Sequence, residues 1–127
     1  MHGTATPEDL STLASALQRI DRHRQSGDTA GCVAALDALV GTAEGRPDLL
    51  QELGLRYTLL GLHRQAERCY AQAVGLRPND PGCLYNHATA LIAMGELTPA
   101  ERLLDRAIEL APEDDAAWYN RSTLRRQ

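Results

Sequence analysis

The sequence predicts an all-α fold of stacked helical hairpins, and two observations carry that prediction. The first is a pattern that occurs twice at an offset of 34 residues, beginning at Pro47 and again at Pro81. The second is that each copy holds two stretches of about fourteen residues with apolar side chains at helical spacing. A single hairpin of this kind cannot bury its apolar face alone, so such units stack side by side.

The repeated positions keep their chemical type from one copy to the next. In the first copy they are Leu50, Gly54, Tyr57, Gly61, Ala66, Tyr70, Ala73 and Pro78. In the second copy they are Leu84, Ala88, Leu91, Gly95, Ala100, Leu104, Ala107 and Pro112. The 34-residue period, with its small residues at fixed places and its late proline, resembles the tetratricopeptide repeat (TPR), a helix-turn-helix unit. The resemblance implies an alpha-alpha superhelix, a helical-hairpin solenoid of about seven helices in this chain.

The breaks between helices follow from local chemistry. Gly61 and Gly95 can adopt the left-handed conformation that ends a helix. Asp80 can cap a helix whose first residue is Pro81. We therefore predict complete repeats over residues 47–80 and 81–114.

The chain before Pro47 fits the repeat less well. Residues 1–7 are predicted to be a loose tail, and residues 8–46 a divergent first repeat within a single domain, 8–127. Its second half keeps the pattern, but Arg19, Ile20 and His23 occupy the places of Leu53, Gly54 and Tyr57. We expect the helix from about Glu8 to Ser26 to cap the stack, as repeat arrays need at their ends.

Residues 115–127 are predicted to form a C-terminal capping helix. Trp118, Tyr119 and Asn120 match the residues that open a TPR unit, whereas Arg121 and Arg125 occupy places that would pack on a partner helix. Polar residues at these two places suit a helix that ends the stack. The alternative interpretation is that the chain leads into a second domain.

Composition excludes several functions. The net charge is −4, which gives no reason to expect nucleic acid binding. All 13 basic residues other than histidine are arginine, so a phosphate-loop lysine and a Schiff-base lysine are excluded.

No signal peptide and no membrane-spanning run is visible, so we expect a cytoplasmic protein, and the composition favours a bacterial source. The three cysteines, Cys32, Cys69 and Cys83, form no CxxC pair and are predicted to be reduced core residues.

No catalytic motif is present, so we predict no enzyme activity, no cofactor and no metal site. His63 and Glu67 lie four residues apart on one predicted helix, but no third metal ligand is evident, and we read them as a solvated face. His87 replaces the apolar Leu53 of the preceding repeat, and we expect it to be a hydrogen-bonded structural residue.

The resemblance implies a concave groove, lined by the first helix of each unit, in which peptides or partner helices bind. The residues that it places there are Gln51, Glu52, Leu55, Leu59, Tyr85, Asn86, Thr89, Ile92, Tyr119, Asn120 and Thr123. Asn86 and Asn120 match an asparagine that the family uses to hold a ligand backbone, although local hydrogen bonding explains them equally well. The acids Asp48 and Glu52 are expected to face the groove, so a neutral or basic, partly apolar segment fits better than an acidic tail.

The sequence therefore predicts a non-catalytic protein-protein interaction module, an adaptor or scaffold that binds a protein or peptide partner. Three alternatives stay open. The chain could be the interaction segment of a larger bacterial enzyme such as a TPR-sulfotransferase, a TPR chaperone of a secretion system, or a homo-oligomer whose groove is filled by another copy.

Overall fold

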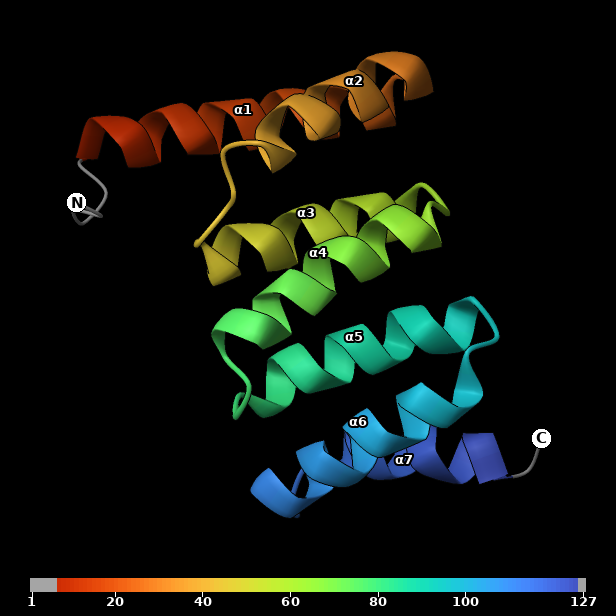
Figure 1. The fold of residues 1–127 in the computed structure, drawn as a ribbon. Helices are drawn as coiled ribbons and strands as arrows, with labels where there is room; N and C mark the ends of the chain where they lie inside the picture. Colours follow the sequence, from red (N-terminus) through yellow and green to blue (C-terminus); the bar gives the residue numbers. More distant parts are fainter. Residues whose placement is uncertain (1–6, 126–127) are drawn as a thin grey trace. The chain divides into compact units, whose positions relative to one another are not determined.

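The computed structural model describes residues 7–125, with the side chains of residues 12–124, and those residues form an all-α fold (Figure 1). The helices are α1 (Pro7–Gln25), α2 (Thr29–Val40), α3 (Pro47–Leu59), α4 (His63–Leu76), α5 (Pro81–Ala93), α6 (Leu97–Leu110) and α7 (Asp115–Arg125). The all-α prediction and the expected seven helices are confirmed. Of the predicted tail, residues 1–6 lie outside the described residues, and Pro7 is the first residue of α1 rather than part of a tail.

The chain divides into two compact units, residues 1–39 and residues 40–127. In the first unit, α1 and α2 are joined by a turn in which Gly27 has a φ of 82°. Asp28 caps α2, because its Oδ1 accepts a hydrogen bond from the backbone N–H of Gly31 at 2.9 Å. Ile20, Cys32 and Leu36 are buried.

The second unit contains two helical hairpins and a final helix. In this unit α3 pairs with α4, α5 pairs with α6, α4 packs on α5, and α7 packs on α6 (Figure 1). Gly61 and Gly95 have φ values of 77° and 79° at the two hairpin turns, as their places in the repeat predict. The predicted cap at Asp80 is confirmed, since its Oδ1 accepts from the N–H of Gly82 at 2.9 Å and Pro81 is the first residue of α5.

The core of the second unit follows the repeat. Its cluster on α5, α6 and α7 consists of Leu84, Ala88, Leu91, Ala100, Leu104, Ala107, Ile108, Ala117 and Leu124. Arg121 joins α7 to α6, because its Nε lies 2.7 Å from Oδ1 of Asp105. Arg121 thus contacts the helix of the preceding repeat on which α7 packs, and not a second helix of its own repeat, so the end cap stays a prediction. The side chain of Arg125 lies outside the described part.

The three cysteines are buried and form no disulfide, as predicted. Burial raises the pKa of the Cys69 thiol to about 11, so this side chain stays protonated at neutral pH and behaves as a small apolar residue. Within residues 7–125, no helix combines the length and the apolar character that a bilayer crossing requires.

Candidate functional site

A pocket of about 220 Å³ opens between α3, α4 and α5 in the second unit. Its walls are chiefly apolar or aromatic, with polar groups from threonine, asparagine and histidine. The lining residues are Leu55, Thr58, His63, Tyr70, Tyr85, Asn86, Thr89, Ala90 and Ala93. No carboxylate and no guanidinium belongs to this lining, so the pocket suits a neutral group.

Four residues of the predicted groove line this pocket, namely Leu55, Tyr85, Asn86 and Thr89. Leu55 is 49% exposed and offers an accessible apolar wall, whereas Tyr85 is half-buried and also packs on the core of α5, α6 and α7. The first helices of two successive repeats therefore do meet at one pocket. A ligand-binding role for these residues stays a prediction.

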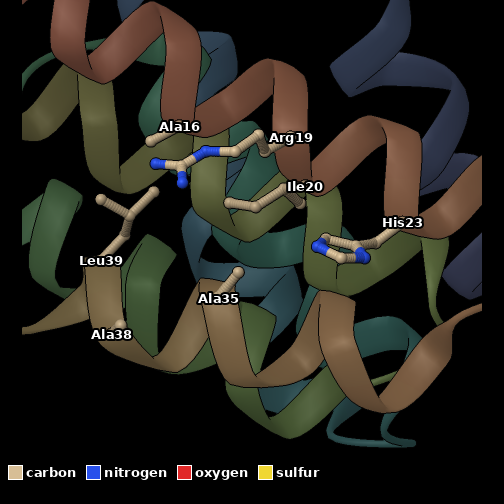
Figure 2. Close-up of a pocket in the computed structure, with 7 residues that line it drawn as sticks. All are labelled: Ala16, Arg19, Ile20, His23, Ala35, Ala38 and Leu39. Carbon is tan, nitrogen blue, oxygen red and sulfur yellow. The ribbon is translucent and has the colours of Figure 1, made fainter.

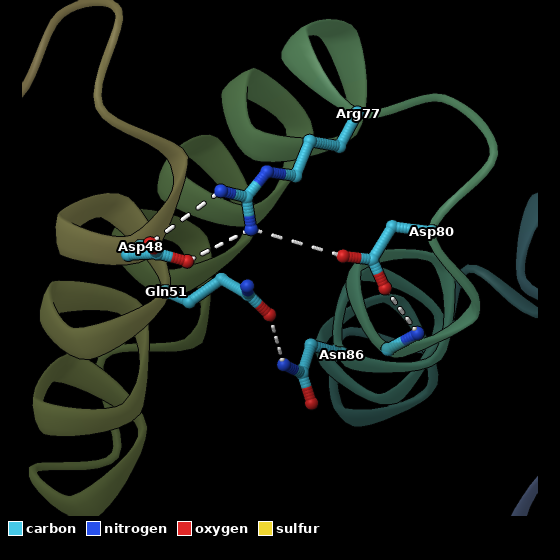
Figure 3. A network of polar contacts seen from close by, with 6 residues as sticks. Asp48, Gln51, Arg77, Asp80 and Asn86 are labelled. Carbon is cyan, nitrogen blue, oxygen red and sulfur yellow. Dashed lines mark hydrogen bonds and ion pairs between the residues drawn. The ribbon is translucent and has the colours of Figure 1, made fainter.

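Asn86 is held by a hydrogen bond between repeats. Its Nδ2 donates to Oε1 of Gln51 on α3 at 2.7 Å, and the amide oxygen of Asn86 points away from Gln51 (Figure 3). Gln51 therefore fixes the amide orientation and uses one of its donors. The acceptor oxygen remains directed away from that contact.

Asn120, one repeat later, is not equivalent to Asn86. Its Nδ2 lies 3.5 Å from Oγ1 of Thr89, at the long limit for a hydrogen bond. The Thr89 hydroxyl itself donates to the backbone oxygen of Tyr85 at 3.0 Å, so it presents only lone pairs to Asn120 or to a ligand.

The charges that were expected to face the groove are neutralised within the protein. Asp48 Oδ1 lies 2.8 Å from Nη1 of Arg77, which follows α4 (Figure 3), and Glu52 Oε2 lies 2.6 Å from Nη1 of Arg56. Each of the two acids thus has an arginine partner within the protein. The predicted preference for a neutral or basic segment stays a prediction.

His63 and Tyr70 line the pocket from α4, although the sequence reading assigned the groove to first helices alone. His63 is not part of a solvated face, because it is half-buried and its Nδ1 is buried with no hydrogen-bond partner among the described residues. Burial raises the pKa of the Tyr70 phenol, and its hydrogen bond with Thr58 acts in the opposite direction. Tyr70 could have been found from its place opposite Gly54, whose lack of a side chain leaves room for the ring.

The remaining predicted residues lie outside this pocket. Leu59 and Tyr119 are 55% and 73% exposed. Ile92 is half-buried and packs against the core of α5, α6 and α7. Thr123 is exposed, and its hydroxyl donates to the backbone oxygen of Tyr119 at 3.0 Å.

His87 also differs from the prediction of a hydrogen-bonded histidine. Its Nδ1 is buried without a hydrogen-bond partner among the described side chains, and its Nε2 lies 3.8 Å from Oε1 of Glu67. Burial lowers the pKa of His87, while the nearby carboxylate of Glu67 opposes that shift. Among residues 12–124, no three His, Cys, Asp or Glu side chains gather as a metal site would require.

Comparison with known proteins decides the family. A model described as tetratricopeptide repeat matches residues 57–122, slightly more than half of the chain. The chain belongs to the tetratricopeptide repeat family. The match spans α4, α5 and α6 and most of α7, and it overlaps the repeat pattern of residues 47–112 from Tyr57 onward. A search of curated proteins gives no match.

Several solved TPR structures share the fold. The first TPR of Spaghetti (RPAP3), bound to the HSP90 peptide SRMEEVD, is 17% identical with a TM-score of 0.71, over 89% of this chain and 90% of that one. The Yersinia enterocolitica type III secretion chaperone SycD, in complex with a peptide of the translocator YopD, is 23% identical with a TM-score of 0.65, over 90% and 89%. MamA is 23% identical with a TM-score of 0.72, and the match covers 87% of this chain but 61% of MamA. At these identities the likeness shows the fold alone.

Proposed function

We propose that this TPR chain is a non-catalytic protein-interaction module whose second unit binds an uncharged, partly apolar segment of a partner protein. The observation that carries the proposal is the neutral pocket of about 220 Å³ where Leu55, Tyr85 and Asn86 converge. A cytoplasmic location without cofactor or metal is part of the same proposal.

In the proposed complex, different pocket residues contact different parts of the bound segment. Leu55 and Tyr85 supply apolar contact for one side chain of the segment, whose burial drives association. Asn86 accepts a hydrogen bond from the N–H of the segment backbone through the amide oxygen that Gln51 does not use. Because Gln51 already fixes the amide, little side-chain entropy is lost on binding.

The TPR structures with bound peptides support a peptide as the ligand class, but the chemistry of the segment differs. The HSP90 peptide SRMEEVD ends in acidic residues. In this chain the pocket lining contains no arginine that could pair with a carboxylate, and Arg56 and Arg77 are engaged by Glu52 and Asp48. We therefore propose a neutral segment rather than an acidic tail.

Peptide display against the full chain tests the proposal. We expect the selected peptides to be uncharged around one large apolar residue. Ala93→Glu places a carboxylate at the edge of the pocket and should weaken peptide binding at least about tenfold. A bound apolar segment would remove water from the new carboxylate, which costs free energy, or would be kept out of the pocket by it. Asn86→Ala should weaken binding less, since it removes one hydrogen bond.

The matched control is Ala34→Glu, which adds the same charge to an exposed position of α2 outside the pocket. Its affinity should equal that of the unchanged chain. Peptides that are predominantly acidic, or that bind Ala93→Glu as tightly as they bind the unchanged chain, would overturn the proposal.

A further inference from the structure

A second pocket of about 220 Å³ lies wholly within the first unit, between α1 and α2 (Figure 2). It shares no residue with the proposed peptide site. Its lining residues are Ala16, Arg19, Ile20, His23, Ala35, Ala38 and Leu39. From the sequence, α1 was expected only to be a divergent helix that caps the stack, and no pocket was predicted here.

The floor of this pocket is apolar. The side chain of Ile20 extends from α1 into the space between the helices, and Ala35 and Leu39 face it from α2 (Figure 2). In the register of the repeat, Arg19 and His23 occupy the places of Leu53 and Tyr57, both of which are buried in the next repeat. Side chains with polar ends therefore border a space whose floor consists of alanine, isoleucine and leucine.

The rim is positively charged. The guanidinium of Arg19 crosses the pocket beside Ala16 and above Leu39 (Figure 2). An adjoining hollow shares Arg19 and His23 and adds Arg22 and Ser26. Among residues 12–124, neither Arg19 nor Arg22 forms an ion pair, so both guanidinium groups are available to an anion.

Asp28, in the turn between α1 and α2, is engaged by other groups. Asp28 Oδ2 lies 3.0 Å from Nδ1 of His23, and its Oδ1 accepts from the N–H of Gly31. Basic residues in the last turn of α1 also offset the helix dipole, which accounts for Arg22. Arg19 lies before that turn, over the apolar floor, so the dipole does not explain it.

We propose that the α1–α2 pocket binds a carboxylate that carries a short aliphatic group. The carboxylate is held by Arg19 and Arg22, whose planar guanidinium groups suit it, and the aliphatic group lies on the floor formed by Ile20, Ala35 and Leu39. The volume of about 220 Å³ is below the roughly 300–1,000 Å³ of drug-sized sites, so the aliphatic group is small.

Titration of the full chain with 4-methylpentanoate, followed by NMR and calorimetry, tests the proposal. We expect saturable shifts confined to Ala16, Ile20, Ala35, Ala38 and Leu39, and weaker binding as salt is added. The uncharged 4-methylpentan-1-ol should bind at least about tenfold more weakly, because charge-assisted hydrogen bonds contribute more than neutral ones. N-acetyl-leucine imitates a peptide C-terminus, whereas 4-methylpentanoate imitates a free acid. The one that binds more tightly identifies the source of the carboxylate.

Three variants assign the binding to these residues. Arg19→Gln with Arg22→Gln should reduce the affinity at least about tenfold while the chain stays helical, because both side chains are exposed. Ala38→Leu, which fills the pocket mouth and keeps both arginines, should also reduce it. Arg102→Gln, an exposed arginine on α6, should bind like the unchanged chain. The proposal is overturned if shifts fail to saturate or lie elsewhere, if the alcohol binds as well as the acids, or if the double variant keeps its affinity.

Discussion

Gly54 of α3 lies directly against the aromatic ring of Tyr70 on α4. A Cβ atom at position 54 would stand 2.6 Å from Cε1 and 2.7 Å from Cζ of that ring, closer than van der Waals contact allows. In the next repeat the same two places hold Ala88 and Leu104, both fully buried. The small residue of the TPR pattern is therefore matched to the bulk of its partner on the second helix.

Gly54→Ala should destabilise the protein by about 1–3 kcal/mol, the usual cost of inserting a methyl group into a packed core. The ring of Tyr70 is buried, so it must shift before a methyl group fits at position 54. This cost outweighs the roughly 0.5–1 kcal/mol that alanine gains over glycine inside a helix. Urea denaturation followed by circular dichroism measures the difference in the free energy of unfolding.

Two controls separate the clash from general helix effects. Gly75→Ala on α4, where a Cβ would meet nothing within 4 Å, should stabilise the protein slightly. In a Tyr70→Leu background, which copies the pairing of Ala88 with Leu104, Gly54→Ala should cost little. An equal cost of Gly54→Ala in both backgrounds would show that the ring of Tyr70 is not the obstacle.

Asn86 and Asn120 should differ in their contribution to stability, although the sequence presents them as equivalents. Asn86→Ala removes the 2.7 Å hydrogen bond to Gln51 and should lower the free energy of unfolding by about 1 kcal/mol. Asn120→Ala removes only the 3.5 Å contact with Thr89 and should change it by less than about 0.5 kcal/mol. Chemical denaturation of both variants gives the comparison.

A double-mutant cycle with Gln51→Ala assigns the cost of Asn86→Ala to the pair. The two single changes should together cost more than the double variant. Additive effects, or equal losses for Asn86→Ala and Asn120→Ala, would contradict the hydrogen-bond geometry that distinguishes the two asparagines.

The sequence was sufficient for features that depend on local spacing. The period between Pro47 and Pro81 placed the hairpins, and Gly61, Gly95 and Asp80 lie where backbone conformation and capping chemistry require them. The caps and turns are predictable because each is decided by residues within a few positions along the chain, and the hairpins because the same pattern recurs after 34 residues.

Features that join distant residues were not predictable in this way. Asp48 was expected to offer its charge to a ligand, but it pairs with Arg77, 29 positions away, because the loop after α4 returns to the start of α3. Likewise, His63 faces a pocket because of how α4 lies against α5, and the spacing along α4 carries no such information. The α1–α2 pocket exists because the side chains around it leave a space unfilled. A repeat pattern specifies the residues that fill the core, so it does not predict such a space.

The burial of His87 should make stability depend on pH. Burial holds the pKa of this imidazole below its ordinary value, more strongly than the carboxylate of Glu67 at 3.8 Å raises it. In the unfolded chain the pKa returns to about 6.5, so as the pH falls through that value the unfolded state binds a proton before the folded state does. The contribution of His87 to stability is therefore constant above that pH, falls as the pH drops below it, and levels off below the folded pKa.

Denaturation at a series of pH values, with His87→Leu as the reference, isolates this contribution. Leucine restores the residue type found at Leu53, the same place in the preceding repeat, and cannot titrate. The rest of the sequence is the same in both proteins, so the difference isolates position 87. We expect the free energy of unfolding of the unchanged chain to fall relative to that of His87→Leu as the pH is lowered below about 6.5. A difference that is flat over this range would mean that the imidazole titrates alike in the folded and unfolded states, and a difference of opposite sign would mean that Glu67 outweighs burial.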